Sequence, residues 1–192
     1  GAGNVANNLL ALGCQVTVAS VIGEDENGWA LLKSFSRQGI DTTPIFQEAG
    51  RRTGRKTRVI ASNQQIVRID RESREPLSAQ VEQQLVSWLQ QHITGFDVVL
   101  ISDYLKGVLT PTVLASITAN ATERNIPVLV DPKGTDYRKY RGATCLTPNR
   151  KEAEAASGIP IRDQESLNRA AETLMSQVEL DNLLITRSEE GM

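Results

Sequence analysis

Polar residues follow four apolar runs in the second half of the chain, at the point where each run ends. They are carboxylates, amides, hydroxyls and cations: Asp103 and Lys106; Asp131 and Lys133; Asn149 and Glu152; Thr186, Arg187 and Gly191. Carboxylates can hold or orient a magnesium ion directly or through water, and Lys and Arg can neutralise phosphate oxygens. In combination, these residue types predict a ligand that brings both phosphate and magnesium.

The runs before these residues are typical of buried parallel strands. Residues 127–130 form a continuous apolar stretch with two β-branched valines, as expected of a strand that is buried on both faces. Predicted helices alternate with such strands, which favours right-handed βαβ units and an α/β fold with a mostly parallel sheet and helices on both faces. Because the carboxyl ends of parallel strands meet at one edge, we expect the polar groups to form one functional edge.

Each polar group also has a purely structural interpretation. Asn149 followed by Glu152 is the pattern of a helix cap, an Asn at the N-cap with a Glu three residues later. Residues 131–134 have the composition of an ordinary turn, and Asp103 could accept backbone donors at the end of a strand. The joint placement of these groups, more than any one of them, favours the functional interpretation.

The hydrophobic pattern predicts the other elements along the chain. Helices are expected at residues 1–12, ending at Gly13, and then at residues 29–38, from Ser78, from Pro111, and at residues 149–156 and 164–178. Strands are expected at residues 15–22, 56–61, 65–70, 96–101, 127–130, 143–146 and 182–185. His92 falls at the predicted end of a helix, where we interpret it as a helix-end residue and not as a catalyst.

A basic stretch at residues 51–70 differs from the acidic chain around it. Five cations lie within eight residues, and the two strand-like runs at 56–61 and 65–70 flank Ser62 and Asn63, which predicts a hairpin. The two-residue period places Lys56 and Arg58 on one face. Such a hairpin could form a lid over an anionic ligand, or it could be a solvated hairpin without a ligand. Nucleic acid ranks lower, because the stretch contains no aromatic residue for base stacking.

Composition excludes several other classes of protein. With 21 Lys and Arg against 23 Asp and Glu, the chain has no general attraction to nucleic acid or to an anionic membrane. It has no secretory signal and no apolar run of membrane-spanning length, which predicts a cytoplasmic protein. The cysteines, Cys14 and Cys145, are predicted to be buried thiols in a reducing compartment. With one histidine and no Cys-x-x-Cys pattern, a zinc site is excluded.

The chain resembles the ribokinase-like carbohydrate kinases, and within them the D-glycero-β-D-manno-heptose-7-phosphate kinases. Neither a Walker phosphate loop nor a Gly-x-Gly-x-x-Gly motif is present, which argues against other nucleotide folds. The resemblance extends over residues 1–192 and is carried by motifs at residues 1–6, 23–28, 62–65, 68–70, 102–107, 131–136, 140–144, 146–152 and 186–191. It implies a doubly wound fold with a lid at about residues 43–70 and a nucleotide-side part at about residues 78–192.

The resemblance also implies an activity, with ATP and Mg²⁺ as cofactors. The γ-phosphoryl group of ATP would pass to O1 of heptose 7-phosphate, giving the 1,7-bisphosphate for ADP-heptose and lipopolysaccharide core synthesis. Expected ATP or phosphate contacts are Asn149, Arg150, Lys151, Glu152, Thr186, Arg187, Gly191 and Lys133. Expected sugar-phosphate contacts are Gly1, Asn4, Lys56, Arg58, Gln65 and Asp103. Glu152, through water, and Asp131 are the expected magnesium contacts, and the parent protein is expected to dimerise through the lid and to be fused to a nucleotidyltransferase domain.

One motif of the family is missing from the sequence. The catalytic base of the family is the Asp of a Gly-Ala-Gly-Asp motif, which would follow Met192. We therefore expect a piece of a longer kinase that is inactive alone. Two alternatives stay open: a non-catalytic module that binds sugar phosphate or forms a dimer, and a kinase for another sugar phosphate.

Overall fold

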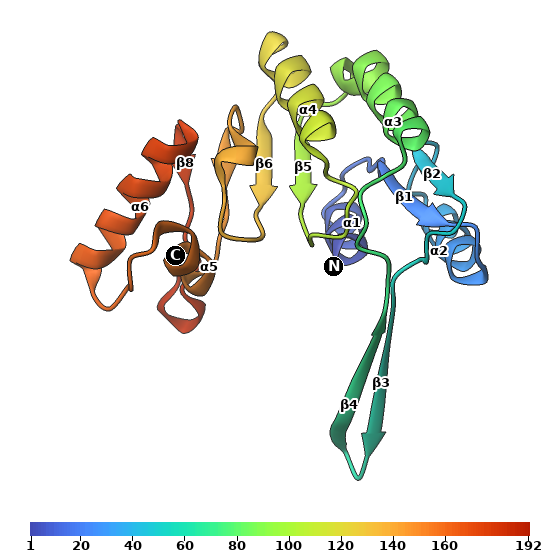
Figure 1. Ribbon diagram of the computed structural model, residues 1–192, viewed down its shortest axis with the longest axis horizontal. Helices are drawn as coiled ribbons and strands as arrows, with labels where there is room; N and C mark the ends of the chain where they lie inside the picture. The colour runs from blue at the N-terminus through green and yellow to red at the C-terminus, as the bar shows by residue number, and fades with distance from the viewer. The chain divides into compact units, whose positions relative to one another are not determined.

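The computed structural model describes all of residues 1–192, and the chain divides into two compact units. The first unit comprises residues 1–85 and 106–110, and the second comprises residues 86–105 and 111–192. Figure 1 labels most of their helices and strands. No helix combines the length and the apolar character that are needed to cross a membrane.

The first unit contains two small sheets and the helices that pack on one of them. Its elements are α1 (Ala2–Ala11), β1 (Ser20–Gly23), α2 (Glu26–Arg37), β2 (Ile45–Glu48), β3 (Arg55–Ala61), β4 (Gln64–Arg71) and the first half of α3 (Ala79–His92). Strands β1 and β2 pair in parallel, and a core of Ala6, Ile22, Phe35, Ile40 and Ile45 joins them to α1 and α2. The expected strand at 15–22 is shorter than predicted, with only an isolated bridge at Thr17 before Ser20.

Helix α2 begins three residues earlier than the hydrophobic pattern predicts. The Asp25 carboxylate accepts a hydrogen bond from the backbone N–H of Gly28 at 2.8 Å, and so caps the helix. Its other oxygen accepts from the backbone N–H of Thr53 at 2.9 Å. A Cβ atom on Gly23 would lie 2.2 Å from the Arg51 carbonyl oxygen, so only glycine allows this close approach of two backbone segments.

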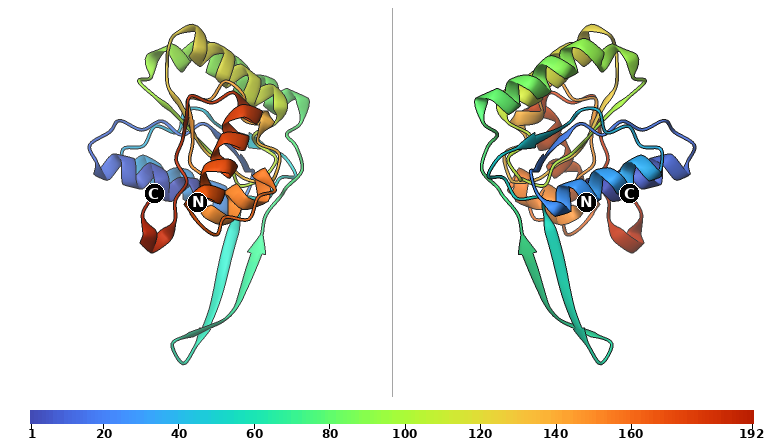
Figure 2. Two further views of the ribbon diagram at one scale, coloured as in Figure 1. Left: turned by 90° about the vertical axis from the view of Figure 1, so that its left-hand side faces the viewer. Right: turned by 90° about the vertical axis from the view of Figure 1, so that its right-hand side faces the viewer.

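Strands β3 and β4 form the predicted hairpin, with Ser62 and Asn63 at its tip. Both residues have positive φ, 48° and 62°, as a tight two-residue hairpin turn requires. Every residue of the two strands is exposed, and Figure 2 shows the hairpin as a two-stranded ribbon without an element of its own unit on either face. Within the stretch 43–70, therefore, β2 belongs to the sheet with β1, and the hairpin begins at β3.

The second unit is the α/β part of the chain. Its elements after α3 are η1 (Ile93–Gly95), β5 (Val99–Ser102), α4 (Pro111–Glu123), β6 (Val128–Asp131), η2 (Arg138–Tyr140), β7 (Cys145–Leu146), α5 (Arg150–Ser157), α6 (Gln164–Val178), β8 (Asn182–Leu183) and η3 (Ser188–Glu190). The four strands form one parallel sheet in the order β5-β6-β7-β8 (Figure 1). The predicted βαβ alternation is confirmed, and the carboxyl ends of the strands meet at one edge.

The two faces of this sheet are buried to different degrees, which corrects the expectation of strands fully buried on both faces. Val128 and Val130 of β6 are 2% and 1% exposed, whereas Leu129 between them is partly exposed. On the neighbouring strand, Ile101 is 4% exposed and Leu100, which pairs with Leu129, is 41% exposed. The continuous apolar run predicted a second cover that the described residues do not supply.

Two smaller expectations have different outcomes. Cys14 is exposed and Cys145 is half-buried, so the prediction of two buried thiols is wrong for Cys14, which lies in the loop after α1. His92 ends α3 as predicted, with Nδ1 2.8 Å from the Trp88 carbonyl oxygen and its ring stacked on the Trp88 indole.

Candidate functional site

An open pocket of about 250 Å³ lies in the second unit, at the carboxyl edge of its sheet. Its lining is almost entirely polar and consists of Asp103, Tyr104, Asp131, Lys133, Thr147, Asn149, Glu152 and Thr186. These residues come from the ends of β5, β6, β7 and β8. The structure thus brings together at least one member of each of the four polar groups that the sequence singles out.

The hydrogen bonds of the sheet set the positions of these groups. Ser102 and Asp131 are register partners at the ends of β5 and β6, and the Asp103 N–H donates to the Asp131 carbonyl oxygen at 3.0 Å. At the other side, Thr186 forms a parallel bridge with Asn149, and the Arg150 N–H donates to the Thr186 carbonyl oxygen at 3.0 Å. The start of α5 is therefore tied to the strand end beside it.

The structural interpretation of Asn149 and Glu152 is confirmed by a complete capping box. The Asn149 side chain accepts from the Glu152 N–H, and Glu152 Oε2 accepts from the Asn149 N–H, both at 3.0 Å. This cap uses one oxygen of the carboxylate and leaves Oε1 for other partners. A helix cap and a site in the pocket are therefore compatible uses of the same Glu152 side chain.

The second oxygen of Glu152 forms an ion pair with Lys133. The distance from Lys133 Nζ to Glu152 Oε1 is 2.6 Å, and this hydrogen bond raises the pKa of Lys133. Lys133 stands in the turn after β6, is 48% exposed at its side chain and is therefore open to an arriving ligand. Its ammonium group is a cation that a phosphate oxygen could take over from Glu152.

Asp131, the last residue of β6, is the carboxylate of the pocket that forms no side-chain hydrogen bond or ion pair. Burial raises the pKa of its carboxyl group, and the negative charges of Glu152 and Asp103 raise it further. Nowhere in the chain do three or more His, Cys, Asp or Glu side chains form a metal-binding group. Two hard oxygen ligands beside an open pocket nevertheless suit Mg²⁺, which commonly takes one or two carboxylates and completes its shell with water and phosphate.

Asp103 is 4% exposed and both of its oxygens are already occupied. Oδ1 accepts from the Leu105 N–H at 2.7 Å, and Oδ2 accepts from the Lys139 ammonium and the Tyr140 hydroxyl, both at 2.6 Å. Lys139 and Tyr140 are site-related residues that the sequence reasoning missed, because neither follows a strand. The sequence marked Tyr140 only as the first residue of the motif at residues 140–144, three residues after a second tyrosine, Tyr137.

The remaining predicted nucleotide residues lie apart from this pocket. Arg150 and Arg187 line a second hollow of about 220 Å³ with residues 161–164, Leu167 and Glu190. The Arg150 guanidinium donates to the Ile161 carbonyl oxygen, and Arg187 lies 3.8 Å from Glu190. Lys151 is exposed on α5, and Gly191, at φ 81°, accepts through its carbonyl oxygen from the Arg187 N–H at 2.7 Å.

Most of the residues predicted to contact the sugar phosphate belong to the first unit. Gly1 is the N-cap of α1, Asn4 is exposed in the first turn, and Gln65 lies near the hairpin tip. The register confirms that Lys56 and Arg58 share a face, opposite Asp70 and Arg68 respectively. Asp70 holds Arg68 through two hydrogen bonds of 2.9 and 3.0 Å and lies 3.8 Å from Lys56.

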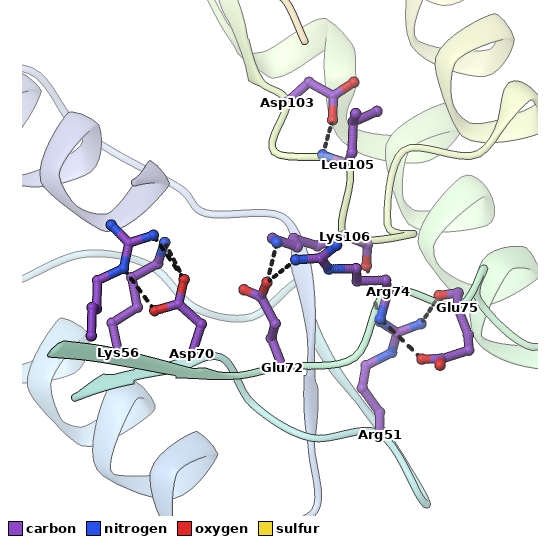
Figure 3. A network of polar contacts seen from close by, with 10 residues as sticks. Arg51, Lys56, Asp70, Glu72, Arg74, Glu75, Asp103, Leu105 and Lys106 are labelled. Atoms are coloured by element: carbon purple, nitrogen blue, oxygen red, sulfur yellow. Dashed lines mark hydrogen bonds and ion pairs between the residues drawn. The ribbon is translucent and has the colours of Figure 1, made fainter. Parts of the chain in front are cut away.

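The Arg58 side chain forms no ion pair or hydrogen bond, and it lies opposite another cation, Arg68, in the strand pair. Figure 3 shows Lys56 beside Asp70, and at the root of the hairpin it shows Glu72 held by Lys106 and Arg74. Arg51, also at the root, donates to the Glu75 carbonyl oxygen at 2.8 Å. The root is neutralised by ion pairs, whereas the middle of the hairpin keeps an excess of positive charge.

Comparison with known proteins identifies the family of the chain. The family model described as pfkB family carbohydrate kinase matches residues 1–192. The chain belongs to the pfkB family of carbohydrate kinases. Its polar edge at the carboxyl ends of parallel strands is thus an edge of a carbohydrate kinase domain.

Curated relatives within this family are longer than the chain. It is 85% identical over 192 residues to the "Bifunctional protein HldE" of Trichlorobacter lovleyi and 65% identical to that of Geobacter metallireducens. In both comparisons all of the chain matches, and it spans 39% of the relative.

Solved structures with lower identity share the fold. The chain superposes on "Sa239" with a TM-score of 0.79 at 20% identity, and on a ribokinase from Arabidopsis thaliana with a TM-score of 0.73 at 16% identity. Each superposition covers 96% of this chain and 59% of the other. The ribokinase-like α/β fold is therefore confirmed. At these identities the two structures give information on the fold alone.

We predict that Asp131→Asn stabilises the chain at neutral pH while removing a charge from the pocket. Because the pKa of Asp131 is raised, the folded state binds its proton more tightly than the unfolded state, so stability falls as pH rises from about 3.8 through the folded pKa. The variant should gain roughly 0.5–1 kcal/mol at pH 7 and nothing near pH 3.5, measured by urea unfolding.

Asp136→Asn is the matched control for this prediction. The exposed Asp136 forms an ion pair with Arg138, which lowers the pKa of its carboxyl group to about 2. Its stabilising effect is therefore present above pH 3.8 and disappears as pH falls towards 2, so this substitution should not stabilise at pH 7. Equal responses of the two variants would contradict the raised pKa that we assign to Asp131.

Proposed function

We propose that the pocket in the second unit binds the phosphates of Mg²⁺-bound ATP in a sugar kinase reaction. The observation that carries the proposal is the group formed by Lys133, Glu152 and the unpaired Asp131 in one open pocket beside Asn149 and Thr186. A cation, two carboxylates, an amide and a hydroxyl are the groups that phosphoryl transfer enzymes use to bind and orient phosphate and metal.

Lys133 is the residue that we expect to change its partner on binding. Its ammonium leaves Glu152 Oε1 for a phosphate oxygen, where it neutralises negative charge on the nucleotide. The capping box holds Glu152 in place during this exchange, because Oε2 stays bound to the backbone of Asn149. The freed Oε1 and the Asp131 carboxylate then face the pocket together.

Asp131 and Glu152 are the residues that would hold magnesium, Glu152 through water. When bound, the ion would neutralise the phosphate oxygens and favour their orientation for in-line transfer. The absence of a hydrogen bond to the Asp131 side chain supports this role, since a half-buried carboxylate without a hydrogen-bond partner is stabilised by a cation.

Heptose 7-phosphate is the acceptor that we propose, with transfer to O1. The identity of 85% to a relative named as a bifunctional HldE protein supports this assignment. The word "bifunctional" also supports a fused nucleotidyltransferase domain in the longer protein. The route to ADP-heptose and lipopolysaccharide core is proposed on the same basis.

The catalytic base is not among the residues of the pocket in our proposal. None of the three carboxylates there is free to act as the base. Asp103 is fully hydrogen-bonded, Glu152 caps a helix, and Asp131 is the proposed metal ligand. No Gly-Ala-Gly-Asp motif occurs in the sequence. We therefore propose that the 192-residue chain binds nucleotide without efficient transfer.

The first test of this function separates binding from turnover. Isothermal titration should detect Mg²⁺-dependent ATP binding, and Lys133→Met should weaken it about 10- to 100-fold through loss of a charge-assisted contact. Lys151→Met tests Lys151, the other lysine among the predicted ATP contacts, which lies in α5. In a coupled ADP-release assay with heptose 7-phosphate, turnover should stay far below the ~1–100 per second of kinases. Normal turnover would refute the assignment of the base, and ATP binding unaffected by Lys133→Met would refute the site.

The hairpin has two faces, and we propose a separate use for each. Lys56 and Arg58, with Arg68, form the cationic face and are proposed to bind the phosphate of the acceptor. The other face carries Thr57, Val59, Val67 and Ile69, of which the last three are 43–46% exposed, and the pair Arg55 and Arg71 lies at its root end. An apolar strand pair without a cover supports dimerisation with a second copy of the chain.

The two faces can be tested against each other. Arg58→Ala should weaken heptose 7-phosphate binding about tenfold or more without changing the molar mass in solution, because it removes the unpaired cation. Val67→Asp should convert a dimer to a monomer in sedimentation equilibrium, because it places a charge on the apolar face. A monomeric wild-type chain would contradict the dimer, and unaltered phosphosugar affinity in Arg58→Ala would contradict the phosphate site.

A further inference from the structure

The Tyr140 hydroxyl joins the ends of two strands inside the second unit. Tyr140 is 0% exposed, donates to Asp103 Oδ2 at 2.6 Å and accepts from the backbone N–H of Lys133 at 3.0 Å. The Lys133 carbonyl oxygen lies 3.3 Å from the same hydroxyl. One buried oxygen thus contacts both backbone polar groups of the residue whose side chain faces the pocket.

No strand ladder could position this part of the backbone. The pairing of β5 with β6 ends at Ser102 and Asp131, and β6 itself ends at Asp131, two residues before Lys133. Gly134, which follows Lys133, has φ 93°, in the left-handed region that favours glycine and is not strand geometry. The position of Lys133 therefore depends on hydrogen bonds from outside the sheet, and the bonds to its backbone come from Tyr140.

The partner that holds Tyr140 is a buried charge. Asp103 is 4% exposed, and its negative charge is balanced by Lys139, whose ammonium also lies 4.8 Å from the centre of the Tyr140 ring. Burying a carboxylate is costly unless it is paired and hydrogen-bonded, and Asp103 meets both conditions without a ligand. With no free oxygen, Asp103 is better suited to holding Tyr140 than to contacting a sugar.

We propose that Tyr140 is a positioning residue that acts through Lys133, and that Asp103 is the buried acceptor that holds Tyr140 in place. The Asp103, Tyr140 and Lys133 contacts together would fix the turn after β6, so that the Lys133 ammonium is presented to nucleotide phosphate with little loss of conformational freedom. This inference rests on the proposed phosphate-binding role of the pocket.

Tyr140→Phe is the direct test, since it removes one oxygen and keeps the ring. In the complete 192-residue chain, the dissociation constant for Mg²⁺-bound ATP should rise roughly 3- to 30-fold. The Lys133 backbone amide should exchange faster with solvent by NMR. Tyr137→Phe is the matched control, because Tyr137 is 1% exposed and its hydroxyl has no hydrogen-bond partner. The control should change neither quantity.

A double-mutant cycle separates positioning from a purely structural role. If Tyr140 acts through Lys133, Tyr140→Phe should have little further effect on ATP affinity in the Lys133→Met background. Equal losses in both backgrounds, or no loss from Tyr140→Phe alone, would overturn the inference while leaving the proposed function intact. A wild-type chain that binds no Mg²⁺-bound ATP would overturn both.

A second variant covers the case in which Tyr140→Phe does not fold. Asp103→Asn keeps the shape of the side chain and weakens its acceptance of the Tyr140 hydroxyl by removing the charge. It should show the same dependence on Lys133, and equal ATP affinity in Asp103→Asn and wild type would contradict the role of Asp103.

Discussion

The buried carboxylate of Asp103 is the constraint on which the carboxyl edge of the second unit depends. A carboxylate that is 4% exposed is costly to bury unless both of its oxygens accept hydrogen bonds. The donors are the Leu105 backbone N–H, Lys139 and Tyr140. These contacts join the η2 segment, which contains Lys139 and Tyr140, to the residues that follow β5 and β6. The Tyr140 hydroxyl, once held there, also determines the backbone of Lys133, and Lys133 in turn pairs with Glu152.

The sequence predicted those parts of the fold that follow from local rules. Period and composition gave the βαβ alternation, the hairpin with Ser62 and Asn63 at its tip, and the cap at Asn149, because each depends on residues close together in the chain. The four polar groups also converged as expected, since parallel strands share an edge. The family resemblance agrees with the match over residues 1–192.

Contacts between distant residues could not be predicted in this way. The bond between Asp103 and Tyr140 joins positions 37 residues apart, and nothing in the pattern around Tyr140 indicates a polar partner. The start of α2 was predicted at residue 29 from the hydrophobic pattern, whereas the N-cap at Asp25 makes the helix begin at Glu26. Burial of the sheet on both faces was inferred from apolar character alone, although Leu100 is 41% exposed. An apolar run predicts a strand more securely than it predicts what covers the strand.

The hairpin and the pocket each contain ion pairs and a charged side chain without a partner. On the cationic face of the hairpin, Asp70 neutralises Arg68 and approaches Lys56, which leaves Arg58 as the cation of that face without a partner. In the pocket, Lys133 neutralises Glu152 and leaves Asp131 as the carboxylate without a partner. In each case the unpaired group has a charge opposite to that of its proposed ligand, which is phosphate for Arg58 and magnesium for Asp131.

An NMR titration of the ¹⁵N-labelled chain with Mg²⁺-bound ATP tests the central claim most directly. Our account predicts that the largest shifts in amide resonances fall on Lys133, Asn149, Glu152 and Thr186, and that the strands of the hairpin respond little. Shifts that are largest in β3 and β4, or the absence of shifts around Lys133 at saturating nucleotide, would contradict it.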